Sequence, residues 1–394
     1  MEVVPTGMEM PVLEVHMEVV NQELEETPSF EDGWAMGDLS GKALCRKAVG
    51  EARSEEMEFM KKIGVYEEVP IEECLKKTGA EPISTRWIDV DKGRGGEALI
   101  RSRLVARDFK VKGDGDRPDL FAATPPLEAL RMLVGLARMK KVRKHKRKKL
   151  KLLFIDVKKA HLNAKLEENE FAYVQLPAEA DAESNKCGRL RRWLYGMRNA
   201  ASSWEKEYAE KLVSEGYTRG KAAPTTFYNR DKDSRCVVHG DDFTFLAEEE
   251  ELQRMSKLMA EWYEIKVRAT MGPDPQDDKE VVILGRTVRW LEDRNEYEAD
   301  DKYVKLICEE MGLNETSKGL DGPSEKDDPE DEADDEDLNK EEAKEFRRIA
   351  ATANYLASDR PDIQYATKEI CRSMSRPKRR SWDKLKRLAR YLLK

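Results

Sequence analysis

The stretch that decides the fold reads Val237-Val238-His239-Gly240-Asp241-Asp242-Phe243-Thr244-Phe245. Apolar residues flank the Gly-Asp pair on both sides, which predicts two antiparallel strands joined by a two-residue turn whose first position needs glycine. Such a hairpin presents Asp241 and Asp242 together at its tip. On its own the pattern is a weak signal, because Gly-Asp-Asp also occurs in ordinary solvated turns.

A third aspartate changes this interpretation. Asp156 closes the apolar run Leu152-Leu153-Phe154-Ile155, which predicts a buried strand that ends in a carboxylate at the rim of a sheet. Carboxylates held close together repel each other, and a divalent cation between them offsets the repulsion. We therefore predict that the three aspartates converge on a phosphoryl-transfer site, where two Mg²⁺ ions act on an attacking hydroxyl and a leaving pyrophosphate.

Charge is distributed unevenly along the chain. The 394 residues allow two or three domains, and a net charge of −8 argues against a uniformly basic nucleic-acid-binding protein. However, ten of the fourteen residues 138–151 are Lys or Arg, and thirteen of the twenty-two residues 321–342 are Asp or Glu. The acidic segment is too charged to bury and is predicted to be a linker.

The basic segment has three interpretations. It binds the phosphates of a template–primer duplex, it forms a solvated loop, or it serves as a nuclear localisation signal. In the first case the expected phosphate contacts are Lys140, Lys141, Arg143, Lys144, Lys146 and Arg147.

The cysteine content and the hydropathy of the sequence indicate in which cellular compartment we expect the protein. Six scattered cysteines without a C-x-x-C pair, and only four histidines, argue against a disulfide scaffold or a zinc site and favour an intracellular location, cytoplasmic or nuclear, rather than secretion. No apolar run approaches the roughly 20 residues of a membrane span, and the N-terminus lacks signal-peptide features. We therefore expect a soluble chain that does not associate with a membrane.

Residues 86–107 predict a strand hairpin with a glycine-rich connection. The alternation of the second strand places Arg101 and Arg103 on one face, where a phosphate can meet both. The alternative is a solvated edge strand protected by charge. Helical spacing of apolar residues predicts further helices after Pro125-Pro126, over 200–215 and around 252–262, and again towards the C-terminus.

Several of these segments, in this order and spacing, resemble the reverse transcriptase of Ty1/copia-type LTR retrotransposons. The resemblance covers about residues 40–394 and is carried by residues 101–109, 121–125, 156–163, 194–204 and 237–245, then by 283–285, 355–363, 374–377 and 382–393.

The resemblance implies an α+β right-hand polymerase with a ferredoxin-like palm sheet. The implied activity is RNA-directed and DNA-directed DNA polymerisation from dNTPs, with two Mg²⁺ or Mn²⁺ ions. The expected parts are a flexible leader (1–40), fingers with the basic segment (41–150), the palm (151–290), a thumb-like helical region (291–320), the acidic linker (321–342) and a helical connection segment (343–394).

The resemblance also implies roles for individual residues. Asp156, Asp241 and Asp242 match the catalytic carboxylates, and the Val157 carbonyl is expected to reach a metal ion. The residues expected to contact the dNTP are Arg101, Arg103, His161 and Asn199. Those expected to contact the primer are Gly240, Leu284 and Gly285.

Some positions depart from the family pattern. Arg101 stands where lysine is usual, His239-Gly240 replaces a tyrosine followed by a hydrophobic residue, His161 replaces an aromatic residue that excludes a ribose 2′-hydroxyl, Asn199 replaces glutamine, and Ala201 replaces proline. These changes leave open a decayed copy that retains only nucleic-acid binding. A third alternative is a soluble α/β domain whose aspartates merely cap loops.

The implied partners are an RNA template, a DNA primer, dNTPs and other retrotransposon Pol products. The sequence contains neither the Asp-Ser/Thr-Gly motif of a protease nor the His/Cys cluster of an integrase, and it ends near Leu393, where an RNase H would follow. We therefore expect a partial gene product without RNase H.

Overall fold

A computed structural model of the chain describes residues 34–37, 41, 43–93, 98–109, 117, 120–139, 141–143, 146–314, 316–325 and 336–394. The expected leader, apart from 34–37, and residues 326–335 of the expected linker lie outside the described residues. Contacts divide the chain into two compact units, Met1–Asp114 with Lys165–Arg198, and Gly115–Ala164 with Asn199–Lys394. Residues 165–198, expected in the palm, therefore pack with the N-terminal unit.

In its described residues, the N-terminal unit contains small antiparallel sheets and two α-helices. The elements are β1 (Trp34–Met36), β2 (Ala43–Cys45), α1 (Arg46–Lys62), β3 (Tyr66–Pro70), α2 (Ile71–Thr78), β4 (Thr85–Asp91), β5 (Ile100–Ala106), β9 (Tyr173–Val174), η4 (Ala178–Ala180) and β10 (Lys186–Leu190). β10 pairs with both β3 and β9, which draws 165–198 into this unit. The predicted hairpin over 86–107 is confirmed, because β4 pairs with β5 along its whole length.

A buried carboxylate ties this hairpin to α1. Asp89 of β4 accepts hydrogen bonds from Arg53 Nη2 of α1 at 2.6 Å and from Ser102 Oγ of β5 at 2.6 Å. The same arginine reaches Glu179 of η4 at 2.9 Å, and Trp87 Nε1 donates to the other oxygen of Glu179. These partners satisfy the buried charge of Asp89 and fix the hairpin on the helix.

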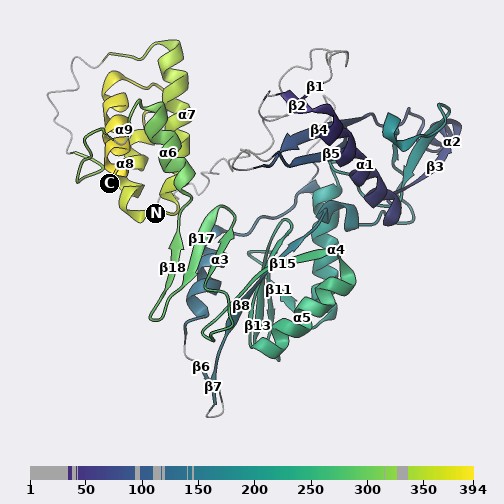
Figure 1. Cartoon of the computed structure of the whole chain (residues 1–394), viewed down its shortest axis with the longest axis horizontal. Helices are drawn as coiled ribbons and strands as arrows, with labels where there is room; N and C mark the ends of the chain where they lie inside the picture. The colour runs from purple at the N-terminus through teal and green to yellow at the C-terminus, as the bar shows by residue number, and fades with distance from the viewer. Residues whose placement is uncertain are drawn as a thin grey trace, which may run out of the picture. The chain divides into compact units, whose positions relative to one another are not determined.

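The second unit is built on a six-stranded antiparallel sheet of order β11-β12-β13-β14-β8-β15 (Figure 1). Its strands are β8 (Lys151–Val157), β11 (Thr218–Arg219), β12 (Thr226–Asn229), β13 (Ser234–His239), β14 (Asp242–Ala247) and β15 (Ile265–Met271). Along the chain, β8 is followed by α4 (Ala200–Ser214), then by the β13–β14 hairpin, α5 (Glu249–Trp262) and β15. This βαββαβ order with neighbours β13-β14-β8-β15 is the predicted ferredoxin-like arrangement.

Both faces of this sheet are covered, which explains the continuous apolar run before Asp156. On one side, two rings of α4 contact the Phe243 ring of β14 edge-on. The centroid of the Phe243 ring lies 6.2 Å from that of Trp204 and 5.4 Å from that of Tyr208. On the other side, Leu152 and Phe154 share a core with α3 (Leu127–Leu136) and with a three-stranded sheet. That sheet contains β16 (Glu280–Ile283), β17 (Arg286–Trp290) and β18 (Asn295–Glu298). Since successive side chains of β8 point to opposite faces, all of them except Asp156 are buried.

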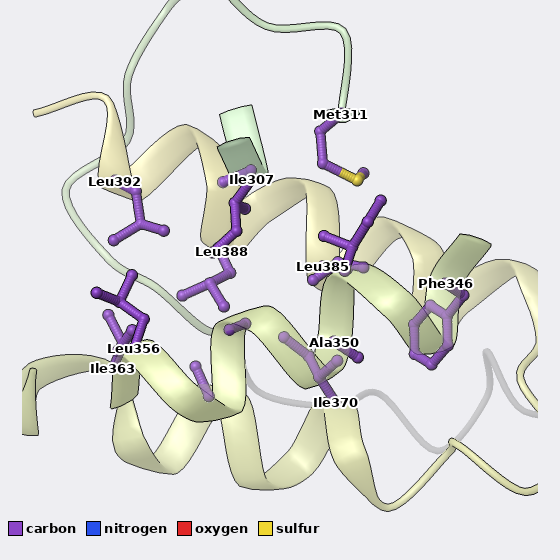
Figure 2. Close-up of a cluster of buried hydrophobic side chains, with 14 of the residues drawn as sticks. Ile307, Met311, Phe346, Ala350, Leu356, Ile363, Ile370, Leu385, Leu388 and Leu392 are labelled. Atoms are coloured by element: carbon purple, nitrogen blue, oxygen red, sulfur yellow. The ribbon is translucent and has the colours of Figure 1, made fainter. Parts of the chain in front are cut away.

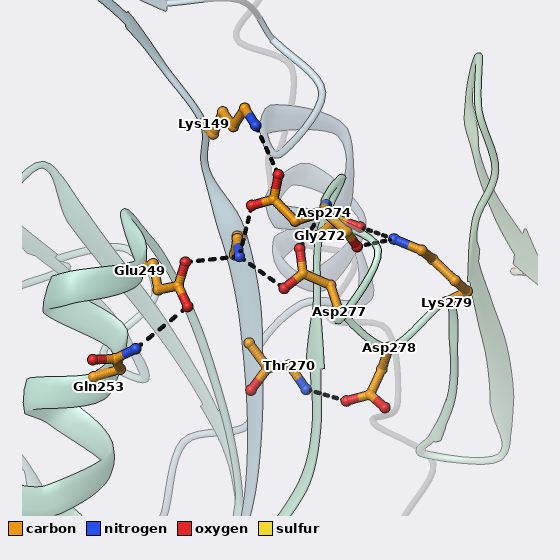
Figure 3. A network of polar contacts seen from close by, with 10 residues as sticks. Lys149, Glu249, Gln253, Thr270, Gly272, Asp274, Asp277, Asp278 and Lys279 are labelled. Atoms are coloured by element: carbon orange, nitrogen blue, oxygen red, sulfur yellow. Dashed lines mark hydrogen bonds and ion pairs between the residues drawn. The ribbon is translucent and has the colours of Figure 1, made fainter.

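A buried lysine lies at the start of β8. Lys151 belongs to the basic segment by sequence, but its side chain is 2% exposed and its ammonium nitrogen lies 2.7 Å from Asp277, 2.9 Å from Glu249 and 3.0 Å from Asp274. Figure 3 shows these three carboxylates converging, with Lys149 on the outer side of Asp274. Burial lowers the pKa of Lys151, but the hydrogen bonds to the carboxylates outweigh this effect and raise the pKa above its ordinary value.

The chain ends in a helical region with its own core. The helices are α6 (Asp301–Glu310), α7 (Lys340–Ala357), η6 (Pro361–Ile363), α8 (Gln364–Cys371) and α9 (Arg379–Leu392). Figure 2 shows Ile307 of α6 together with Phe346, Leu356, Leu385 and Leu388 from α7 and α9 in one apolar cluster. Through the described parts of the chain, none of the helices has the length and apolar character needed to cross a bilayer.

Residues 291–320 differ from the expected thumb-like helical region. In the described part of that range, β18 is a strand and α6 is the one α-helix. Ile307 and Cys308 of α6 are buried in the core that α7, α8 and α9 form. The amphipathic face of α6 thus joins the C-terminal helices, because a helix of ten residues gains most of its stability from such packing.

A capping box starts α7, and its removal is a test of the helical region. The Asn339 side chain accepts hydrogen bonds from the amides of Glu341 and Glu342, both at 3.0 Å, and Glu342 accepts one from the Asn339 amide. We expect Asn339→Ala to destabilise α7 by about 1 kcal/mol, measured as faster hydrogen exchange of its amides. Lys344→Ala, on the exposed side of the same helix, is the control, and equal effects of both changes would contradict the capping role.

Candidate active site

Asp156 and Asp242 lie directly opposite each other. The register of β8 and β14 pairs the two residues, and the Val157 amide donates a hydrogen bond to the Asp241 carbonyl at 2.8 Å. Side chains at opposed positions of an antiparallel pair point to the same face, with Cβ atoms about 5 Å apart. Two carboxylates separated by 86 positions along the chain therefore meet on one face of the sheet.

The turn places the third aspartate differently from the expectation. His239 pairs with Asp242, so the two turn residues are Gly240, with φ of 63°, and the exposed Asp241. The Gly240 carbonyl accepts a hydrogen bond from Trp204 Nε1 at 2.9 Å, which anchors the turn on α4. Asp242 is not at the tip: it is the first residue of β14 and is 8% exposed. Of these two neighbouring aspartates, Asp241 is exposed to solvent and Asp242 is not, because the sheet pairing begins at Asp242.

Burial and neighbouring charges raise the pKa of Asp242 to about 7. Desolvation is the largest cause, Arg268 opposes it, and repulsion from Asp241 and Asp156 adds to it. The Asp242 Oδ1 atom is buried and accepts no hydrogen bond from any described residue. An ionised Asp242 thus carries a charge that this part of the protein compensates only in part.

Arg268 of β15 is the nearest positive charge. Its Nη2 atom lies 2.7 Å from Asp156 Oδ1 and 3.4 Å from Asp242 Oδ1. Sequence reasoning missed this residue, because β15 was not predicted. The one available signal was the short alternation Ile265-Lys266-Val267-Arg268, which is typical of a half-buried strand.

A cavity of about 460 Å³ opens beside Asp156. Arg268 and Lys266 of β15 line it together with Glu280, Val281 and Val282 of β16. Across the described ranges, no group of three or more Asp, Glu, His or Cys side chains is already gathered in metal-binding geometry. The geometry alone therefore provides two opposed carboxylates, a third carboxylate in the adjoining turn, and an open polar space beside them.

Comparison with known proteins identifies the family. Residues 74–272 match the model of the family described as reverse transcriptase (RNA-dependent DNA polymerase), which is half of the chain. The chain belongs to the reverse transcriptase family. The family match and the curated relatives named below confirm the predicted resemblance to Ty1/copia-type enzymes and the α+β polymerase class.

Two curated relatives are plant transposon proteins. The Retrovirus-related Pol polyprotein from transposon TNT 1-94 of Nicotiana tabacum is 24% identical over 86% of this chain and 25% of its own length. The corresponding protein from transposon RE2 of Arabidopsis thaliana is 22% identical over 79% of this chain and 20% of its own length. The chain thus spans about a quarter or less of the length of these relatives.

One solved structure similar to this chain is a foamy viral protease-reverse transcriptase in complex with an RNA/DNA hybrid. It is 11% identical, with a TM-score of 0.38 over 88% of this chain and 37% of that chain.

The expected dNTP residues of this chain are distributed over both units. Arg101 is exposed and Arg103 half-buried on one face of β5, as the alternation predicts, while Ser102 and Leu104 point to the buried face. The Arg103 guanidinium lies 5.3 Å from the centre of the Tyr195 ring. In the other unit, His161 is half-buried in η3 (Ala160–Asn163), which packs on α4, the helix that Asn199 precedes.

The expected primer residues Leu284 and Gly285 form the two-residue turn between β16 and β17. Both have positive φ, 50° and 74°. Leu284 lines a small, mainly apolar cleft that His239 and Asp242 also line. This turn therefore lies near one of the opposed carboxylates. Gly240, the third expected primer residue, is the residue next to His239.

The basic segment contains two short paired strands, β6 (Lys141–Arg143) and β7 (Lys146–Lys148). Lys140 and Lys144 lie outside the described residues. For Lys141, Arg143, Lys146 and Arg147 the structure describes the backbone alone, so their role as phosphate contacts stays a prediction.

Proposed function

We propose that this chain is an RNA-directed and DNA-directed DNA polymerase that extends a primer 3′ end with dNTPs by two-metal phosphoryl transfer. One observation carries the proposal: Asp156 and Asp242 oppose each other on paired strands of a ferredoxin-like sheet in a member of the reverse transcriptase family. Family membership supports polymerase chemistry, and the opposed carboxylates are the groups that such chemistry needs.

The residues that would hold divalent cations are Asp156, Asp241 and Asp242, with the Val157 carbonyl. The donor set fits Mg²⁺ or Mn²⁺, because Mg²⁺ takes few protein carboxylates and completes its coordination with water and phosphate oxygens. The buried Asp242 Oδ1, which accepts no hydrogen bond from the described residues, supports the same assignment. Cations held there supply the positive charge that lowers the pKa of an attacking hydroxyl and stabilises a leaving pyrophosphate.

The remaining roles belong to side chains that bind and orient the substrates. Arg101 and Arg103 would neutralise the triphosphate, and the contact of Arg103 with Tyr195 restricts its guanidinium to fewer orientations. His161 and Asn199 would contact the nucleotide. Since histidine is smaller than the usual aromatic residues, we expect weaker discrimination against a ribose 2′-hydroxyl.

The Leu284–Gly285 turn supports the proposed primer contact. A leucine with φ of 50° is strained, because its Cβ approaches the backbone, and such strain is often retained at functional sites. The cleft that Leu284 shares with His239 and Asp242 would bring the primer end next to a carboxylate.

The proposed partners are an RNA template, a DNA primer and dNTPs, with other Pol products as a further possibility. The proposed location is the cytoplasm or the nucleus. All six cysteines lie among the described residues and are free, which supports a reducing compartment.

Primer extension tests this proposal. The full chain is incubated with dNTPs, Mg²⁺ or Mn²⁺, and a DNA primer annealed to an RNA or a DNA template, beside the variant Asp156→Asn. We expect product on both templates from the wild type, loss of product with EDTA, and at most residual product from the variant. Equal product from both proteins would contradict the role of Asp156.

The second candidate function is nucleic-acid binding without turnover, in a decayed copy. The replacement of the usual aromatic and hydrophobic pair by His239-Gly240 favours it, since Gly240 offers no side chain to a primer end. A wild type that binds the duplex but yields no product above background would establish this alternative.

A further inference from the structure

Arg268 occupies the position where the opposed aspartates need positive charge. β8 lies between β14 and β15, so the Arg268 side chain extends from β15 past Asp156 towards Asp242. One nitrogen, Nη2, serves both carboxylates, at 2.7 Å and 3.4 Å. A single guanidinium thus lies between the two carboxylates that would hold a divalent cation.

A bulge in β15 places Arg268 beside Asp156 of β8. Lys266 pairs with Asp156 and Val267 with Ile155, but Ala269 pairs with Phe154, so Arg268 is the extra residue. In a regular strand residue 268 would oppose Phe154, on the face that packs into the apolar core. The bulge keeps the guanidinium beside Asp156 instead, and bulges commonly re-aim side chains in this way near active sites.

The compensation by Arg268 is partial. Its single positive charge faces two carboxylates, with the turn carboxylate of Asp241 nearby. The hydrogen bond of Nη2 goes to Asp156, while Asp242 Oδ1 accepts none from the described residues. A divalent cation has twice the charge and can take both oxygens as ligands, so it can displace the guanidinium.

Arg268 has somewhere to go when it is displaced. The cavity of about 460 Å³ beside Asp156 is lined by Arg268 itself, and Glu280 is on the same lining. Glu280 already accepts a hydrogen bond from Arg289 at 2.7 Å and would offer a carboxylate to the released guanidinium. The open side of the cavity would also admit water to Arg268 and Glu280.

We propose that Arg268 is a tethered cation that competes with the divalent metal for Asp156 and Asp242. Metal binding requires release of Arg268 from Asp156, so this residue weakens metal affinity and limits binding in the absence of substrate. The inference rests on the proposed function in that it uses the same carboxylates. It concerns the metal-free chain and can be tested without measuring polymerisation.

Mn²⁺ binding to the full chain, without dNTP or nucleic acid, tests the inference. Free Mn²⁺ is followed by electron paramagnetic resonance for the wild type, Arg268→Gln, Arg268→Lys and the control Arg294→Gln. Arg294→Gln loses the same charge, but the partners of Arg294 are Asp293 and Glu296, which lie within two positions of it along the chain. We expect Arg268→Gln to tighten Mn²⁺ binding about tenfold, since loss of one charge-assisted hydrogen bond removes the competing partner. Arg268→Lys retains a charge and is expected to change affinity less, and the control is expected to match the wild type.

The outcomes separate this inference from the proposed function. Unchanged or weaker Mn²⁺ binding by folded Arg268→Gln overturns the inference, and identifies Arg268 as a purely structural ion pair. Tighter binding that disappears in Arg268→Gln combined with Asp156→Asn supports it. Tighter binding in a protein that extends no primer leaves the inference standing and removes the polymerase proposal. If neither the wild type nor Arg268→Gln binds Mn²⁺, both fail.

Discussion

Asp242→Asn is expected to reduce primer extension by on the order of 10³-fold or more, because the amide removes one of the two opposed anionic ligands. The same change is expected to raise the free energy of unfolding at pH 7 in the absence of metal. The wild-type carboxylate is buried, lies opposite Asp156, and has one oxygen without a hydrogen bond from the described residues. A neutral amide avoids that desolvation and repulsion. Opposite signs for activity and stability are the signature of a functional carboxylate.

The pH dependence of stability follows from the raised pKa of Asp242. The pKa is about 7 in the folded chain against an ordinary value of 3.8, so the folded state binds the proton more tightly than the unfolded state. Without metal, the contribution of Asp242 to stability is therefore largest below about pH 4 and falls as the pH rises to about 7. The total fall is on the order of 2–4 kcal/mol. Urea unfolding of the wild type and Asp242→Asn across this range measures it, and only the wild type is expected to show this component.

Asp293→Asn is the matched control for this prediction. Asp293 lies in an exposed turn, with a side chain that is 72% exposed, and pairs with its neighbour Arg294. We expect neither activity nor the pH profile to change. If Asp242→Asn behaved like this control, Asp242 would be an ordinary buried acid and the proposed metal site would lose its best-shielded ligand.

The sequence predicts the centre of the site because local patterns determine it. The apolar run before Asp156 requires a strand that is buried on both faces, and the Gly240-Asp241 pair requires a two-residue turn, so the aspartates were expected to converge. The spacing of Trp204, Tyr208 and Leu212 likewise predicts a helix over 200–215, close to the observed Ala200–Ser214. The position of Asp242 within the strand, rather than at the tip, depends on one residue of register, which the pattern alone does not specify.

The residues whose roles the sequence analysis did not predict contact partners that are far away along the sequence. Arg268 pairs with Asp156 across 112 positions, and it lies at a bulge of β15. By sequence, Lys151 is one more cation of the basic segment. In the structure its side chain is buried, because it pairs with Glu249 and Asp277, which lie 98 and 126 positions away along the chain. Neither hydrophobic periodicity nor local charge contains this information, since both describe neighbours along the chain.

Lys151→Met is expected to destabilise the second unit by about 3–5 kcal/mol. The change leaves Asp277, with a side chain that is 4% exposed, and Asp274 and Glu249 without their shared cation. The loop after β15 is packed tightly around this group, because a Cβ at Gly272 would lie 2.4 Å from Asp277 Oδ2 and 2.8 Å from Lys151 Cγ. Since β8 carries Asp156 five residues after Lys151, we also expect loss of primer extension as the strand loosens. Thermal and urea unfolding measure the first effect.

Lys149→Met separates the buried network from simple loss of charge. Lys149 contacts the same Asp274 at 2.7 Å, but its side chain is 66% exposed, so water already screens the pair. We expect a cost below about 1 kcal/mol from this control. Combining Lys151→Met with Asp277→Leu should recover part of the lost stability, because a buried ion pair can often be replaced by apolar side chains without large cost. If the single Lys151 variant were as stable as the Lys149 variant, the three carboxylates would be solvated or protonated in the folded chain, and Lys151 would not be the cation that holds β8 to α5 and to the loop after β15.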